Sequence, residues 1–194
     1  EMMQNYKSYI ESRGPDSLYS VHSGMNIKKL TFLYNTVKKL KPEICVETGV
    51  ANGFSTAVIL LALTENKKGK LYSIDICYKP TGVLIPEKLK RRWVLIEGLI
   101  KSKLKQLVLD IPKIDFFLHD GSHTYKDMLF DYSTVWAKMP KKSILVSDDV
   151  NYNDPTMTEP IEVRHEREHR RFCVALEGYE ACLMYRQSGK EIDL

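Results

Sequence analysis

The most constraining feature of this sequence is a regular alternation of short apolar runs with segments of helical periodicity. The apolar runs are 44–46, 71–74, 93–96, 116–118 and 144–146, and the acids at or just after their ends are Glu47, Asp75, Glu97, Asp120 and Asp148. Helical patterns fill the intervals at about 26–40, 54–66, 84–92, 99–109 and 124–138. Continuous apolar strands separated by helices predict a parallel sheet covered on both faces.

The fold class predicted from this order is α/β, with a Rossmann-like, doubly wound and mostly parallel sheet. We expect one domain, made of an N-terminal cap or lid (1–25), a core (26–150) and a C-terminal part (151–194). The C-terminal part is expected to hold a charged helix over about 160–176, and then an edge hairpin that pairs 179–185 with 191–194. In such sheets ligands bind outside the carboxyl ends of the strands, so the acids there are the main functional clue.

Composition narrows the class of protein further. With 29 basic against 25 acidic side chains and 43% apolar residues, the chain is neither disordered nor fibrous. Its longest apolar run, Ala57 to Leu63, is far shorter than the roughly 20 residues that a membrane-spanning helix needs. The four cysteines lack C-x-x-C spacing and suit reduced thiols, and no signal-like segment opens the sequence. We therefore expect a cytoplasmic protein with no membrane partner.

Two basic clusters raise the question of nucleic acid. Lys88–Arg92 and Lys101–Lys105 are each interrupted by leucine at helical spacing, which is typical of solvated helix faces. Nucleic acid is therefore not favoured as a partner.

A glycine loop joins the first predicted strand to its helix, over residues 47–56, with Gly49 and Gly53 where the backbone turns tightly. The loop matches neither G-x-G-x-x-G nor a P-loop, and alone it is compatible with an ordinary strand-to-helix turn. Asp75 ends the second strand, a position at which an acid accepts hydrogen bonds from the two hydroxyls of a ribose. Together the two features indicate an adenosine-like ligand, but they do not separate a dinucleotide from S-adenosylmethionine.

These same segments carry a family resemblance. Residues 46–56, VETGVANGFST, resemble the first motif of class I S-adenosylmethionine-dependent methyltransferases, and residues 69–75, GKLYSID, resemble the second. The sequence is most similar to small-molecule O-methyltransferases of the catechol and caffeoyl-CoA kind and to their bacterial relatives, over about residues 26–150. The resemblance implies S-adenosylmethionine as cofactor, a small-molecule hydroxyl as acceptor, and a homodimer as the common assembly.

The resemblance also implies roles for particular residues near the cofactor. Glu47 would contact its methionine end, Gly49 and Gly53 would let the backbone approach, and Asp75 would bind the ribose hydroxyls. The other implied cofactor-binding residues are Ser55, Gly98, Leu99 and Asp120, with Gly98 and Leu99 in the segment that walls the adenine.

Carboxylates at the ends of the fourth and fifth strands suggest a metal site. Asp120 and the pair Asp148 and Asp149 would converge above the sheet, where a divalent ion such as Mg²⁺ would relieve their repulsion. The metal-dependent members of the family ligate their ion with an Asp after the fourth strand and an Asp-Asn pair after the fifth. The three acids align with these ligands, except that Asp149 replaces the Asn.

His123 is the expected catalytic base, with Asp120 as a second catalytic residue. The family's catalytic lysine falls three residues after the first metal Asp, where this chain has His123. That departure resembles the D-G-D-H-S-Y motif of bacterial relatives and leaves metal dependence open. A histidine suits general-base work near neutral pH, since its unperturbed pKa is about 6.5. Thr124 and Asp127 resemble a capping box for the helix that follows.

One further motif, in the C-terminal part, is weak evidence for a zinc site. Residues 165–169 spell H-E-x-x-H, the zinc-protease signature, but four arginines surround it and oppose binding of a zinc ion. A salt-bridged exposed helix accounts for the segment, and a third reading places His165 and His169 at the rim of the substrate pocket.

Three other functions stay open from sequence alone. The departures from the metal ligands and the lysine are compatible with a nucleotide-binding protein that transfers no methyl group. The basic clusters keep RNA methylation open. A nicotinamide dehydrogenase is the third and weakest of these functions, because the sequence does not contain the G-x-G-x-x-G signature of such enzymes.

Overall fold

The computed structural model describes residues 27–77, 80–148, 171–176 and 179–185. A single sheet runs through it in the order β3-β2-β1-β4-β5-β7-β6. Its strands are β1 (Ile44–Thr48), β2 (Lys70–Asp75), β3 (Trp93–Glu97), β4 (Phe116–His119), β5 (Ile144–Ser147), β6 (Arg171–Leu176) and β7 (Tyr179–Tyr185). The first five are mutually parallel, and the chain reverses its direction of winding between β1 and β4. This is the Rossmann-like, doubly wound order that the alternation predicts.

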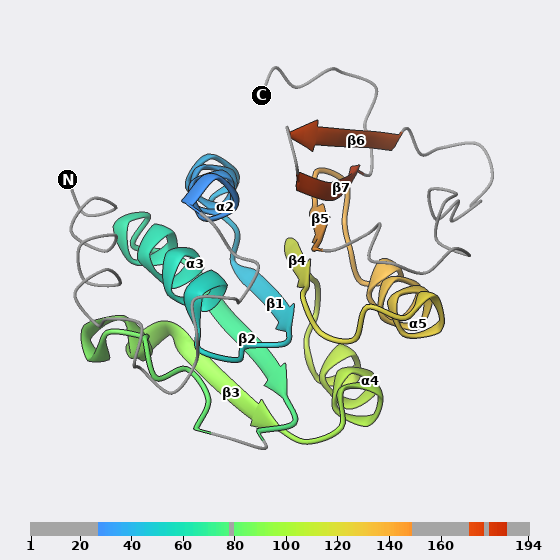
Figure 1. The fold of residues 1–194 in the computed structure, drawn as a ribbon, viewed down its shortest axis with the longest axis horizontal. Helices are drawn as coiled ribbons and strands as arrows, with labels where there is room; N and C mark the ends of the chain where they lie inside the picture. The colour runs from blue at the N-terminus through green and yellow to red at the C-terminus, as the bar shows by residue number, and fades with distance from the viewer. Residues whose placement is uncertain (1–26, 78–79, 149–170, 177–178, 186–194) are drawn as a thin grey trace.

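Helices cover both faces of the sheet (Figure 1). The helical elements are α2 (Ile27–Leu40), α3 (Phe54–Glu65), the short 3₁₀ helix η1 (Glu87–Arg92), α4 (Ile100–Asp110) and α5 (Tyr125–Trp136). One apolar core lies between the sheet and α2, α3 and η1, and the other lies between the sheet and α4 and α5. No helix in the described part of the chain is long and apolar enough to cross a membrane.

Helix α3 is the central element of the first face. Every residue from Ser55 to Leu63 is buried, because α2 covers the side of α3 that the sheet does not. A helix that is apolar all round is stable only when it is enclosed in this way. The N-terminus of α3 is thereby fixed directly above the end of β1.

Side chains alternate between the two faces along each strand, and this alternation sorts the polar residues at the strand ends. On β5, Ile144 and Val146 belong to the α2/α3 core and Leu145 to the α4/α5 core. Continuing the pattern, Ser147 contacts Tyr132 of α5, and Asp148 contacts Lys29 of α2. The same alternation on β4 turns His119 toward α5.

Two predicted helices differ in the structure. The pattern at 84–92 yields only the six-residue η1, which begins after Pro86 with a backbone hydrogen bond from Leu89 to the Pro86 carbonyl. Residues 171–176, expected to end the charged helix, form strand β6 instead. Pairing with β7 decides their conformation, since an aromatic and a β-branched residue in RFCVAL fit a strand as well as a helix.

The edge of the sheet therefore differs from the expected hairpin. β7 pairs antiparallel with β5 and with β6, which precedes it in sequence. The partner predicted for 179–185, residues 191–194, lies outside the described residues, as do the expected cap at 1–25 and the H-E-x-x-H segment.

Candidate functional site

The glycine loop and the end of β2 are tied together by one carboxylate. Asp75 Oδ2 accepts hydrogen bonds from the backbone N–H groups of Val50 (2.7 Å) and Ala51 (3.1 Å). Its Oδ1 accepts from the backbone N–H of Cys77 at 2.8 Å. The side chain is half-buried, so the loop and the acid that the sequence assigns to one ligand do meet at one place.

The two loop glycines are required by packing and by backbone conformation. Gly49 has φ +86°, and a Cβ atom there would lie 1.9 Å from the carbonyl oxygen of Asp120. Gly53 has φ +89°, and its Cβ would lie 2.7 Å from Ile85. Both conformations are ones that side chains other than glycine rarely adopt. The structure thus explains both glycines by close approach within the chain, and their approach to a cofactor stays a prediction.

Glu47 lies in a fully buried cluster of hydroxyl groups. One carboxylate oxygen accepts from Ser55 Oγ at 2.6 Å, and the other accepts from Thr56 Oγ1 at 2.8 Å and Ser73 Oγ at 2.7 Å. Trp93 Nε1 in turn donates to Ser73 Oγ. This arrangement joins β1, β2 and the first turn of α3. The hydrogen bond between Glu47 and Ser55 therefore fixes the start of α3 against the end of β1. Direct contact of either residue with a cofactor stays a prediction.

Burial raises the pKa of Glu47 to about 7, although the hydrogen bonds from Ser55, Ser73 and Thr56 oppose that rise. Because the folded state then holds a proton that the unfolded state releases near pH 4.5, this group lowers the free energy of unfolding as pH rises from about 5 to 7.

We expect the variant Glu47→Gln to lose this pH dependence. At 1.36 kcal/mol per pKa unit, the wild type should lose about 3 kcal/mol more stability than the variant between pH 5 and pH 8. Urea unfolding followed by circular dichroism at both pH values measures the difference. Parallel stability curves for the two proteins would contradict the assignment.

Apolar side chains stand exposed beside Asp75. Ile76 follows it directly and is 42% exposed, and Leu99, at the start of α4, is 68% exposed. Gly98, with φ +136°, donates its backbone N–H to the Asp75 carbonyl oxygen at 2.9 Å, which brings this turn against the end of β2. The segment predicted to wall an adenine ring is therefore apolar, exposed and next to Asp75, the acid predicted to bind the ribose.

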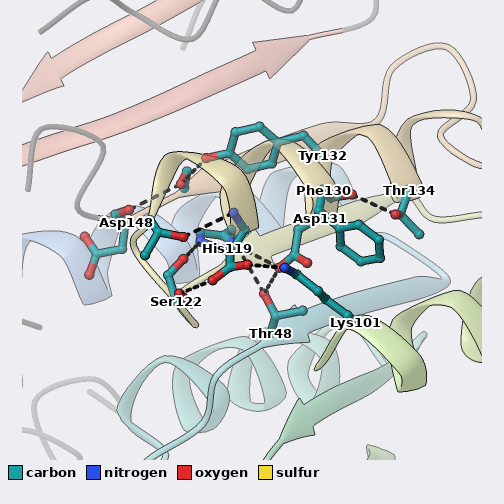
Figure 2. Close-up of polar contacts among 12 residues, drawn as sticks. Thr48, Lys101, His119, Ser122, Phe130, Asp131, Tyr132, Thr134 and Asp148 are labelled. Carbon is teal, nitrogen blue, oxygen red and sulfur yellow. Dashed lines mark hydrogen bonds and ion pairs between the residues drawn. The ribbon is translucent and has the colours of Figure 1, made fainter. Parts of the chain in front are cut away.

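A buried polar network holds the loop after β4, and Figure 2 shows it. His119 is wholly buried, with Nδ1 at 2.9 Å from Asp131 Oδ2 and Nε2 at 3.1 Å from the carbonyl oxygen of Ser122. Thr48 Oγ1 also donates to Asp131 Oδ2. These contacts join β1, the loop after β4 and α5, and they fix the imidazole ring of His119 between them.

This network fixes the loop that carries Asp120 and His123. The backbone N–H of Asp120 donates to the Thr48 carbonyl at 2.8 Å, so Asp120 lies beside the glycine loop. His123 is partly exposed, and its ring meets that of His119 edge-on with centroids 6.3 Å apart. The predicted cap is present, because Thr124 Oγ1 accepts from the backbone N–H of Asp127. Asp120 and His123 are thus held at the carboxyl end of the sheet, beside the glycine loop.

The structure does not place Asp148 as the sequence predicts for a metal ligand. Asp148 is only 6% exposed, and its Oδ1 forms an ion pair with Lys29 Nζ of α2 at 2.5 Å. Asp149 lies outside the described residues. Within the part of the chain that is described, no three His, Cys, Asp or Glu side chains gather as ligands of an ion would. Asp148, as placed here, does not fit the role of a ligand of a divalent metal, since the ammonium group of Lys29 occupies its carboxylate.

Sequence reasoning missed three residues of this region. Asp131 lies on the apolar stripe of α5 with Met128, Tyr132 and Val135, and a buried acid on such a stripe is a signal that could have found it. Thr48 carries no signal of its own. Lys29 is 119 positions away from Asp148, and nothing in the pattern of its helix separates it from the neighbouring lysines.

A comparison with protein families decides where the chain belongs. A family model described as a methyltransferase domain matches residues 46–150, a range that begins within β1 and ends shortly after β5. The chain belongs to this methyltransferase family. The resemblance drawn from the two sequence motifs is thereby confirmed.

Solved structures of methyltransferases share the fold. An O-methyltransferase from Bacillus cereus in complex with S-adenosylhomocysteine superposes with a TM-score of 0.66 at 15% identity, over 93% of this chain and 89% of that one. The methyltransferase PaMTH1 from Podospora anserina, also bound to S-adenosylhomocysteine, gives 0.66 at 13% identity, over 95% and 88%.

A third similar structure is TomG, an O-methyltransferase of tomaymycin synthesis from Streptomyces achromogenes, solved with S-adenosylmethionine. It gives a TM-score of 0.67 at 14% identity, over 97% of this chain and 90% of that one. At these identities the likeness establishes the Rossmann-like methyltransferase fold. Among curated proteins, no sequence matches significantly.

Proposed function

We propose that this methyltransferase transfers the methyl group of S-adenosylmethionine to a hydroxyl group of a small molecule. The observation that carries the proposal is Asp75, a half-buried carboxylate at the end of β2 that also holds the glycine loop after β1. An acid in this position of a doubly wound sheet binds the hydroxyls of a ribose.

The surroundings of Asp75 suit the rest of such a cofactor. Ile76 and Leu99 offer exposed apolar surface for an adenine ring. Asn52, within the loop, is buried, and its Oδ1 has no hydrogen-bond donor among the described residues, so it can accept from an amino group of a ligand. The similar structures that were solved with S-adenosylmethionine or S-adenosylhomocysteine favour this cofactor over others.

The chain's own chemical task is then to orient the acceptor and take its proton. The bound cofactor supplies an electrophilic methyl group on a sulfonium centre. His123 is the base that we assign to the acceptor hydroxyl, because the residue is partly exposed at the strand ends and belongs to the loop after β4, which the contact between His119 and Ser122 holds in place. A positioned base contributes about 10²-fold to 10⁴-fold to rate.

Calorimetric titration of the purified protein tests the cofactor assignment. In separate titrations, we expect S-adenosylmethionine and S-adenosylhomocysteine each to bind with one molecule per chain. The dissociation constants should lie between about 1 μM and 1 mM, the usual range of KM values for enzyme substrates. NAD is the matched control, because it contains the same adenosine group but carries no methionine. Binding of NAD alone, or of none of the three, would overturn the proposal.

The contacts of the basic clusters do not favour an RNA substrate. Lys101 pairs with Asp127, and the ammonium groups of Lys101 and Lys105 lie 5.6 and 5.3 Å from the centre of the Phe130 ring. In the other cluster, Lys90 pairs with Glu87. These lysines already have partners within the chain, so we keep the small-molecule acceptor as the proposal.

A further inference from the structure

Lys29 has no part in the proposed cofactor binding or proton transfer, yet its side chain is largely buried. It comes from the first turn of α2, and its side chain, 12% exposed, crosses to the carboxyl end of β5 to pair with Asp148. The Asp148 side chain is itself only 8% exposed. Two charges removed from water to this degree persist only when they are paired closely.

The position matters because β4 and β5, which are adjacent, are each followed by an acid at this edge of the sheet. The backbone N–H of Asp148 donates to the His119 carbonyl at 2.9 Å, so Asp148 and Asp120 follow neighbouring residues of adjacent parallel strands. Carboxylates brought together in this way repel one another unless a cation or a proton intervenes. The structure supplies that cation from α2.

An ammonium group and a divalent ion cannot both occupy the carboxylate of Asp148. A Mg²⁺ or Mn²⁺ ion needs carboxylate oxygens in direct contact, whereas Lys29 already contacts Asp148 Oδ1. A metal ion there would also lie close to the charge of Lys29, and like charges repel strongly at low exposure to water. Binding of the metal would therefore require Lys29 to leave.

We propose that Lys29 takes the place of a divalent metal at the carboxyl end of β5, so that this methyltransferase binds no metal there and needs none for turnover. Lys29 acts as a positioning residue that neutralises and fixes Asp148. The statement on turnover rests on the proposed function, but the statement on metal binding does not.

The first test is titration of the wild-type protein with Mn²⁺, followed by electron paramagnetic resonance of the free ion. We expect no site tighter than about 1 mM, because a fixed ammonium holds the carboxylate. One Mn²⁺ per chain at micromolar affinity, lost in Asp148→Asn, would overturn the proposal whether or not the protein transfers methyl groups.

Three variants separate the charge of Lys29 from its bulk. We expect Lys29→Met to bind Mn²⁺ at least 10-fold more tightly than the wild type, and Lys29→Arg, which keeps the cation, to behave as the wild type. Lys28→Met, on an exposed residue of the same helix, is the matched control and should also be unchanged. A thermal melt establishes that each variant is folded. If a folded Lys29→Met gains no more Mn²⁺ affinity than Lys28→Met, Lys29 is not what excludes the ion.

Turnover gives an independent readout. With any acceptor that yields S-adenosylhomocysteine, we expect rates in 5 mM EDTA within about twofold of those in Mg²⁺, since no step requires the metal. A loss of 10-fold or more in EDTA would contradict the proposal. If no acceptor yields product, the function proposed above fails, and the Mn²⁺ titration still decides the question of the metal.

Discussion

Asp75→Ala is expected to weaken the binding of S-adenosylmethionine by about 10²-fold to 10⁴-fold. A hydrogen bond to a charged acceptor contributes about 1.5–3 kcal/mol, and two ribose hydroxyls would lose that acceptor together. The variant also releases the backbone N–H groups of Val50 and Ala51, which the carboxylate holds in the glycine loop.

The structure adds a condition on how the ribose binds. A carboxylate offers about four acceptor positions, and the N–H groups of Val50, Ala51 and Cys77 occupy three of those of Asp75. Two ribose hydroxyls would therefore displace at least one of these backbone donors. We infer that either the glycine loop or the turn after β2 adjusts when the cofactor enters.

Calorimetry with Asp75→Ala, beside Asp110→Ala as control, measures the effect. Asp110 is an exposed acid at the end of α4, so its removal changes the net charge by the same amount without touching the site. Affinity of the Asp75 variant within threefold of the control would show that the ribose is bound elsewhere.

His123→Ala is expected to lower kcat by about 10²-fold to 10⁴-fold and to leave the affinity for S-adenosylmethionine within threefold of the wild type. The reason is that a base acts on the acceptor and not on the cofactor. Steady-state rates of S-adenosylhomocysteine formation, with calorimetry on the same samples, separate the two effects.

The control for His123 is Lys126→Ala, which changes an exposed residue in the first turn of α5. It should leave both constants unchanged. A His123 variant that keeps its kcat would remove the histidine from the reaction, and one that loses cofactor binding would mean that the loop after β4 has a structural role in the cofactor site.

Sequence predicted the core of this protein well, because its signals there are local. Apolar runs that end in acids give β1 to β5 within one or two residues, and the glycine loop and Asp75 meet as expected. The order of these elements is enough to specify a doubly wound sheet, since parallel strands need crossover helices.

The features that sequence did not predict depend on contacts between distant segments. The ion pair of Lys29 with Asp148 joins the first described helix to the fifth strand. The pairing of His119 with Asp131 depends on which face of β4 meets α5. β6 was expected to be helical, because its periodicity fits both structures and only its partner β7 decides between them.

The measurement that tests the account most directly is the formation of S-adenosylhomocysteine from S-adenosylmethionine carrying a deuterated methyl group, across a panel of catechols and other small hydroxyl compounds. The proposed function predicts a product that gains the labelled methyl on oxygen, in a ratio of one to each S-adenosylhomocysteine formed. Tight binding of S-adenosylmethionine with no S-adenosylhomocysteine from any acceptor would contradict it, and would indicate a protein that binds the cofactor without transferring its methyl group.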